Sequence, residues 1–240
     1  MNINFDQRLI NKKFRSISTR DTRTQIYFGG AGSSKSFSVF TYSVIWALQG
    51  KSILCIRHND AHITRSIWSE VTKAITRLKL SRFFSINKSD RSISCKISNG
   101  CIMFSGIMDS EKIKSATPLQ GTAFDTIIVE EASELNESQL NQLYLRQRGT
   151  TKFKKTLIML LNPIFKSHFI YDRFFKQFES DFDLNDLNLH IDTKDLFIER
   201  STYRDNVYLA DEDIATIESM KEISPYHYDV YGNGLWGGIS

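Results

Sequence analysis

The chain has 240 residues, of which 41% are hydrophobic and 24% charged, and its net charge is +4. This composition is typical of a soluble globular protein with a substantial core, either one large α/β domain or one domain with a small appendage. No apolar run is long enough to cross a membrane, and the amino terminus lacks the apolar centre of a signal peptide, so we expect a cytosolic protein. The mild positive charge supports a polyanion partner only weakly.

The first predicted element is a strand over Gln25–Phe28 that leads into a glycine-rich loop. The loop reads Gly-Gly-Ala-Gly-Ser-Ser-Lys-Ser and precedes a helical apolar pattern from Phe37 to Leu48. In such a loop, backbone amides turn toward anionic oxygens, the lysine reaches the β and γ phosphates, and the last hydroxyl binds Mg²⁺. The predicted nucleotide-binding residues are Gly29, Gly30, Ala31, Gly32, Ser33, Ser34, Lys35 and Ser36.

One position of this loop departs from the consensus Gly-x-x-x-x-Gly-Lys-Ser/Thr. Ser34 stands where the second glycine is expected. The alternative interpretation is a Gly/Ser-rich surface turn that happens to precede Lys35. Because the loop alone does not decide between the two, motifs elsewhere in the predicted sheet must do so.

The middle of the chain alternates strands with helices. A buried strand over Ser52–Ile56 precedes a helical pattern from Ile63 to Leu78, and Ser92–Phe104 has the pattern of a hairpin whose Asn99-Gly100 pair favours a type I′ turn. We expect an α/β fold of the P-loop NTPase, RecA-like type, with a mainly parallel sheet, helices on both faces and a β-hairpin insertion. The further strand-like runs are Phe124–Val129, Thr156–Leu161, Leu187–Ile191 and Leu196–Ile198.

The three cysteines are predicted to be buried and reduced. Cys55, Cys95 and Cys101 are odd in number, lie in apolar strand-like runs and lack the paired spacing of metal ligands. Their position in the expected core indicates a packing role.

Two adjacent carboxylates follow the strand over Phe124–Val129. Glu130 and Glu131 lie at its carboxyl end, where open α/β sheets bind ligands. We assign Mg²⁺ binding to Glu130, and orientation or deprotonation of the attacking water to Glu131. The alternative is that both acids begin a solvated helix that runs through Glu134 and Glu137. Because the loop and the acids are expected at the same edge of one sheet, we favour the metal-binding and catalytic roles over the solvated helix start.

Asn162-Pro163 follows the next strand at the same edge. Asn162 is placed to sense the γ-phosphate, while Pro163 directs the chain away from the sheet. The alternative is that the proline simply ends the strand. The aromatic, amphipathic segment from His168 to Phe175 is predicted to pack in the core.

Taken together, these residues resemble the large terminase subunit of tailed bacteriophages, especially the branch related to defective-prophage packaging enzymes. The resemblance covers most of the chain, and the ordered set of motifs is far more specific than any one of them. It comprises the loop from Gly29, then Arg57, Arg65-Ser66, Phe104-Ser105-Gly106, Lys112-Ile113-Lys114-Ser115, Ile128 to Ala132, Asn162-Pro163, His168, Ser201 to Asn206 and Tyr231 to Gly237.

The resemblance implies a motor domain that hydrolyses ATP with Mg²⁺ and translocates double-stranded DNA into a prohead. It implies a portal protein and a small terminase subunit as partners, a homo-oligomeric ring during packaging, a monomer in isolation, and the cytoplasm of a host bacterium as location. By motif position, Lys35 and Ser36 look like the phosphate and Mg²⁺ contacts, Glu131 like the catalytic acid and Asn162 like the coupling residue.

Two departures from the family pattern affect this assignment of roles. Many relatives carry an arginine where this chain has Ala31, so the charge-stabilising arginine comes from elsewhere or is missing. Arg57, Arg146 and Arg148 are the candidates, although each is equally consistent with a surface salt bridge. Family members also usually continue into a nuclease domain with an RNase H-like fold, whose clustered acids bind two metals.

We therefore expect the ATPase part alone, with an N-terminal extension over residues 1–24 and a motor domain over residues 25–240 that includes a C-terminal linker region. The acids near the end of the chain are not interpreted as a nuclease metal cluster. Asp205, Asp211 and Asp213 flank a helix start, where acids commonly cap.

Two other functions fit the same motifs. Another P-loop DNA translocase, such as a RecA-like helicase, would share the loop and the acids. Ser34, Ala31 and the lack of a nuclease domain are also consistent with a nucleotide-binding assembly subunit that does not hydrolyse ATP. By charge alone, the plausible DNA contacts are Lys12, Lys13, Arg15, Lys152, Lys154 and Lys155, although such residues are more often merely solvated.

Overall fold

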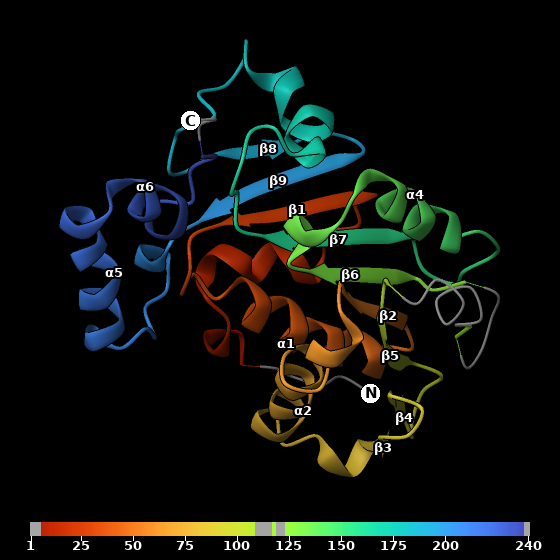
Figure 1. Cartoon of the computed structure of the whole chain (residues 1–240). Helices are drawn as coiled ribbons and strands as arrows, with labels where there is room; N and C mark the ends of the chain where they lie inside the picture. The colour runs from red at the N-terminus through yellow and green to blue at the C-terminus, as the bar shows by residue number, and fades with distance from the viewer. Residues whose placement is uncertain (1–5, 109–116, 119–122, 238–240) are drawn as a thin grey trace.

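The structure is a computed structural model of the chain, and it describes residues 6–108, 117–118 and 123–237. Within these residues the centre is a nine-stranded sheet with the order β3-β4-β5-β2-β6-β7-β1-β9-β8 (Figure 1). The strands are β1 (Thr24–Gly29), β2 (Ser52–Arg57), β3 (Phe84–Asn87), β4 (Ser92–Cys95), β5 (Cys101–Gly106), β6 (Thr126–Glu130), β7 (Thr156–Leu161), β8 (His190–Asp192) and β9 (Leu196–Ser201).

The six central strands of the sheet run parallel, which confirms the prediction. In their spatial order they are β5, β2, β6, β7, β1 and β9. β3, β4 and β8 are antiparallel additions at the two edges. Parallel strands need crossover connections, and helices supply several of them. The helices are α1 (Lys35–Leu48), α2 (Ile67–Arg77), α4 (Glu137–Arg146), α5 (Asp211–Ile223) and the short α6 (Pro225–His227).

Helices cover both faces of the sheet, as predicted. α1 and α2 lie on one face, and α4 lies on the other together with a π-helical turn, η6, over Tyr171–Phe175 (Figure 1). Alternate side chains of a strand point to opposite faces. Tyr27 therefore packs in the α1 core, whereas Ile26 and Phe28 pack in the α4 core.

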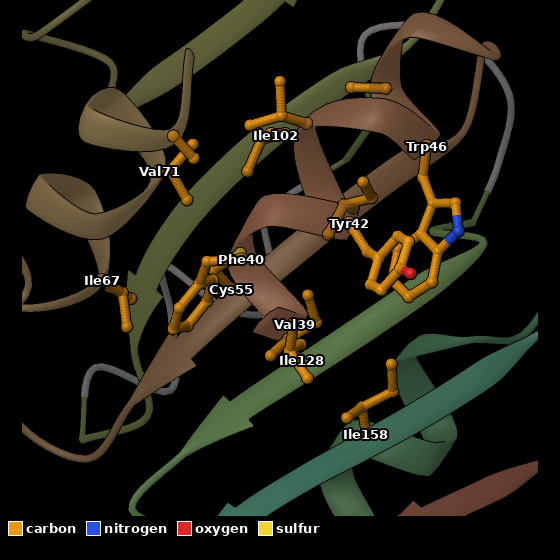
Figure 2. Packing of buried hydrophobic residues seen from close by; sticks show 14 of the residues in the cluster. Val39, Phe40, Tyr42, Trp46, Cys55, Ile67, Val71, Ile102, Ile128 and Ile158 are labelled. Atoms are coloured by element: carbon orange, nitrogen blue, oxygen red, sulfur yellow. The ribbon is translucent and has the colours of Figure 1, made fainter. Parts of the chain in front are cut away.

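Apolar packing fixes α1 on the sheet. Figure 2 shows Val39 and Phe40 of α1 among the strand residues Cys55 and Ile128, all of them buried. Because this contact is dense and apolar, it holds the amino end of α1 in place at the carboxyl edge of β1. The three cysteines are buried, as predicted, and no disulfide joins them.

The predicted hairpin is confirmed, but the predicted turn is wrong. β4 and β5 pair antiparallel, yet neither Asn99 nor Gly100 has the positive φ that a type I′ turn requires. Gly100 instead packs against the end of α1, where an added Cβ would lie 1.9 Å from the carbonyl oxygen of Ala47. β5 also pairs in parallel with β2, and β3 extends the hairpin by a strand that the sequence analysis did not anticipate.

Both ends of the described chain pack on the same sheet. Ile10, Phe14 and Ile17 are fully buried in the α1 core. α5 and α6 lie beyond the carboxyl ends of β1 and β9 (Figure 1). α5 begins at Asp211, within the predicted helix start that Asp205, Asp211 and Asp213 flank. None of the helices in the described part has the length and apolarity that a membrane span requires.

Candidate nucleotide-binding site

The glycine-rich loop joins β1 to α1 at the carboxyl edge of the sheet, so the predicted order of strand, loop and helix is confirmed. Three of its residues have a positive φ: Gly29 at 138°, Gly32 at 68° and Ser34 at 66°. At Ser34 this is the left-handed conformation that explains why glycine is the consensus residue there. The serine therefore adopts the backbone shape of the consensus loop at some cost in strain.

Lys35 occupies the centre of the loop. Its ammonium group donates to the carbonyl oxygens of Gly29 at 3.1 Å and Gly30 at 2.7 Å, to Ser33 Oγ at 3.1 Å, and to Asn162 Oδ1 at 3.2 Å. Burial lowers the pKa of Lys35 to about 8, while the charge of Glu131 acts in the opposite direction. This cation is therefore held by neutral oxygens, which an anionic phosphate can replace.

Glu130 ends β6 inside the same site and is only 8% exposed. Burial raises the pKa of its carboxyl group, and a hydrogen bond from Ser36 and the charge of Arg57 oppose that shift. Its Oε2 atom is buried and accepts no hydrogen bond from the described residues. A buried carboxylate beside a serine hydroxyl is a donor set that suits Mg²⁺.

Glu131 follows directly, with its backbone in the left-handed region at φ 54° and ψ 51°. Such strain in a residue other than glycine is concentrated at functional positions. The alternative interpretation as a solvated helix start is wrong for Glu130, whereas Glu131 directly precedes a short 3-10 helix over Ala132–Glu134. Glu130 belongs to the sheet, and α4 begins later, at Glu137, with its own capping box from Asn136.

One of the three candidate arginines reaches this site. Arg57, at the end of β2, forms ion pairs with Glu130 at 3.5 Å, Glu131 at 3.8 Å and Glu134 at 3.6 Å. Arg146 and Arg148 lie at the far end of α4, on either side of a glutamine that donates to the carbonyl oxygen of Thr156 at 2.9 Å. Thr156 begins β7, so these two arginines lie at the opposite edge of the sheet.

The loop, the acids and Asn162 enclose one cavity of about 330 Å³. The cavity arises because β6, β7 and β1 are consecutive parallel strands of the sheet, so that their carboxyl ends lie close together. Its lining consists of Gly30 to Phe37, Glu130, Glu131, Leu160, Leu161 and Asn162.

Residues that carry no recognised motif role support the loop from outside. Asn206 Nδ2 donates to the carbonyl oxygen of Gly32 at 2.7 Å, and Asn11 Nδ2 donates to Ser34 Oγ at 3.2 Å. The amide of Ala31 donates to the carbonyl oxygen of Tyr231 at 2.6 Å. Asn206 could have been predicted from the sequence, because the polar run before it directly follows β9 at this edge of the sheet. The sequence around Asn11 contains no pattern that would indicate such a role.

Several of the basic residues named as DNA contacts have internal partners. Lys13 pairs with Asp205 and Lys154 with Asp21, both at 3.3 Å. Lys155 donates to a backbone carbonyl oxygen. Their contact with DNA stays a prediction.

A glycine-rich loop between a strand and a helix, with an acid at the end of a nearby parallel strand, defines a P-loop NTPase. The sequence model of the phage terminase large subunit family matches residues 21–235. The chain belongs to that family.

The similarity of the chain to a curated member of the family supports this assignment. The chain is 28% identical over 225 residues to the PBSX phage terminase large subunit of Bacillus subtilis (strain 168), a match that covers 89% of this chain and 49% of the relative. The chain thus spans about half the length of that curated relative.

Two solved structures have the same fold. The large terminase of the thermophilic bacteriophage D6E in complex with ADP superposes with a TM-score of 0.70 at 17% identity, over 95% of this chain and 54% of that one. The large terminase ATPase domain of Thermus phage P74-26 superposes with a TM-score of 0.64 at 12% identity, over 93% and 92%.

Proposed function

We propose that this chain is the motor part of a phage DNA-packaging enzyme, which couples hydrolysis of ATP with Mg²⁺ to translocation of double-stranded DNA. The observation that carries the proposal is the convergence of Lys35, Glu130, Glu131 and Asn162 on one cavity. Membership of the terminase family and the ADP complex of the D6E enzyme support it.

Each residue has a role that its position allows. Lys35 and the loop amides would bind the β and γ phosphates, and Ser36 with Glu130 would hold Mg²⁺, which would neutralise phosphate charge. Glu131, at the mouth of the cavity, orients the attacking water and accepts its proton. Asn162, which accepts a hydrogen bond from Lys35, would sense the γ-phosphate and couple its loss to the sheet.

The arginine assignment follows the same geometry. Arg57 acts within its own chain, where it balances the charges of three carboxylates. Arg146 and Arg148 lie at the opposite edge of the sheet from their own site, so in a ring they would serve only a neighbouring subunit.

The partners follow from the family and not from contacts in this chain. We propose a homo-oligomeric ring that acts with a portal protein and a small terminase subunit in the cytoplasm of a host bacterium. Residues 1–24 would then serve as an N-terminal extension to a motor domain over residues 25–240.

Steady-state ATP hydrolysis by this chain, with and without double-stranded DNA, tests the proposal. We expect turnover that DNA stimulates and that Lys35→Ala abolishes. Strand separation in place of translocation would indicate a helicase. Portal binding without ATP hydrolysis would indicate an assembly subunit, and either result would overturn the proposal.

A further inference from the structure

The imidazole ring of His168 joins two segments that leave the sheet beside the candidate site. Its Nε2 atom lies 3.2 Å from the carbonyl oxygen of Leu135, and its Nδ1 atom lies 3.2 Å from the backbone nitrogen of Ile170. Leu135 belongs to the segment that follows β6, whereas His168 and Ile170 belong to the segment that follows β7. The ring therefore connects positions that are 33 residues apart in the chain.

Each of these two segments begins with a residue of the candidate site. Glu131 directly follows β6 and precedes the 3-10 helix over Ala132–Glu134, and Leu135 is the residue that caps the end of this helix. Asn162 directly follows β7. Both Glu131 and Asn162 line the phosphate cavity, which His168 does not. His168 is thus placed to relate the position of one site residue to that of the other.

The short 3-10 helix connects Leu135 rigidly to Glu131. The amide of Leu135 donates to the carbonyl oxygen of Ala132 at 3.1 Å, and the amide of Glu134 donates to the carbonyl oxygen of Glu131 at 2.9 Å. The left-handed backbone of Glu131 is strained, and such strain persists only where surrounding contacts hold it. A hydrogen bond that fixes the carbonyl group of Leu135 therefore restrains Glu131 as well.

The two backbone partners of the ring determine which of its nitrogens carries the proton. The amide of Ile170 can only donate, so Nδ1 accepts, and the carbonyl oxygen of Leu135 can only accept, so Nε2 donates. His168 is therefore the neutral imidazole with its proton on Nε2. Burial lowers the pKa of His168, against hydrogen bonds to the carbonyl oxygens of Leu135 and Ser133, and this favours the same neutral form.

Resting on the proposed function, we propose that His168 is a positioning residue for ATP hydrolysis, which holds Glu131 in place for the attacking water and ties it to the segment that begins with Asn162. His168 acts through Leu135 and does not contact the nucleotide. When the γ-phosphate leaves Asn162, the movement of that segment reaches Glu131 through the same ring.

His168→Asn separates this link from the local turn. The asparagine oxygen takes the place of Nδ1 and accepts from the amide two residues later, as in an Asx turn, but the side chain is too short to reach Leu135. We expect kcat to fall about 10- to 100-fold, because a small displacement of a catalytic group has this effect. The affinity for the β,γ-imido analogue of ATP should stay unchanged. Undiminished turnover, or an equal loss of turnover and of affinity, would overturn the proposal.

His168→Gln is the conservative variant. Its longer amide side chain can place an N–H group where Nε2 donates, so it keeps the hydrogen bond to Leu135 and loses the acceptor for Ile170. Turnover should stay within about threefold of that of the unaltered chain, since the hydrogen bond to Leu135 is retained. A loss in His168→Gln as large as that in His168→Asn would contradict the proposal, because the ring would then serve only the turn.

A double-mutant cycle tests whether His168 acts through Glu131. If it does, His168→Asn should cause no further loss of single-turnover hydrolysis in a chain that already carries Glu131→Gln. A merely structural role would lower the rate by the same factor in both backgrounds. Equal factors would therefore show that His168 does not position Glu131.

His190→Asn is the matched control. His190 lies on the edge strand β8, where its Nδ1 atom is 3.7 Å from a carboxylate oxygen of Glu199, and it does not line the phosphate cavity. The same substitution removes an imidazole contact away from the acids, so kcat and analogue affinity should stay unchanged. A loss of turnover equal to that in His168→Asn would show that His168 acts only through general packing.

The NMR signals of the His168 ring nitrogens, identified by their loss in His168→Asn, separate failure of this inference from failure of the proposed function. They should shift when the ATP analogue binds, and Asn162→Ala should abolish the shift although the analogue still binds. If the shift appears but the chain never hydrolyses ATP, the motor function falls and the link stands. If the chain hydrolyses ATP and His168→Asn has no effect, the inference falls and the motor function stands.

Discussion

The ammonium group of Lys35 lies 3.2 Å from the side-chain oxygen of Asn162, although the two residues are 127 positions apart in the chain. Their contact follows from the register of two parallel strands. Phe28 of β1 pairs with Leu161 of β7, so the residues after each strand emerge side by side. A phosphate bound by Lys35 is therefore within reach of a side chain anchored in the neighbouring strand.

Affinity for ATP should fall as the pH rises above about 8. Burial lowers the pKa of Lys35 to about 8 in the empty site, and bound phosphates favour the protonated amine and raise it again. Above that pH, binding requires uptake of a proton, so the Kd should rise about tenfold for each pH unit. Calorimetry at about pH 8.5 in two buffers of different ionisation enthalpy measures this uptake. In Lys35→Met this pH dependence should vanish.

Glu131→Gln should reduce ATP hydrolysis by a factor of about 10² to 10⁴ and leave ATP binding intact, because it removes the proton acceptor but keeps the shape. Single-turnover hydrolysis and equilibrium binding measure the two effects separately. The control is Glu134→Gln, which also loses an ion pair with Arg57 but does not line the cavity. Undiminished turnover in Glu131→Gln would contradict a catalytic role for Glu131.

Ser34→Gly should change the free energy of unfolding by less than about 1 kcal/mol, because relief of left-handed strain is offset by greater freedom of the unfolded chain. Ser34→Val should destabilise the fold by about 2 kcal/mol, since a β-branched residue tolerates a positive φ poorly. Urea denaturation measures both. Equal stability of the two variants would show that the φ of 66° at this position is not maintained in solution.

Gly100→Ala should destabilise the protein more than Gly50→Ala does. A Cβ at Gly100 would lie 1.9 Å from the carbonyl oxygen of Ala47, whereas a Cβ at Gly50 would meet nothing within 4 Å. Gly50 has a φ of 99°, so its substitution tests backbone strain alone. We expect about 3 kcal/mol for Gly100→Ala and about 1 kcal/mol for Gly50→Ala in urea denaturation. The reverse order would contradict the packing of this turn on α1.

The sequence by itself determined the phosphate-binding loop, the acids after β6 and the alternation of strands and helices. These features depend on local requirements: glycine where φ is positive, apolar periodicity along each element, and acids directly after a buried strand. The same reasoning failed at Asn99-Gly100, because that glycine is required by contact with α1 and not by the turn itself.

Only the tertiary structure decided which distant residues join the site. It brought Arg57 to the acids and left Arg146 and Arg148 at the opposite edge, because β2 ends beside β6 while α4 runs back along the sheet. It also placed Asn11, Arg77 and Asn206 around the loop, from three segments with no shared pattern. Such contacts depend on strand order and on packing between remote segments, and the local sequence indicates neither.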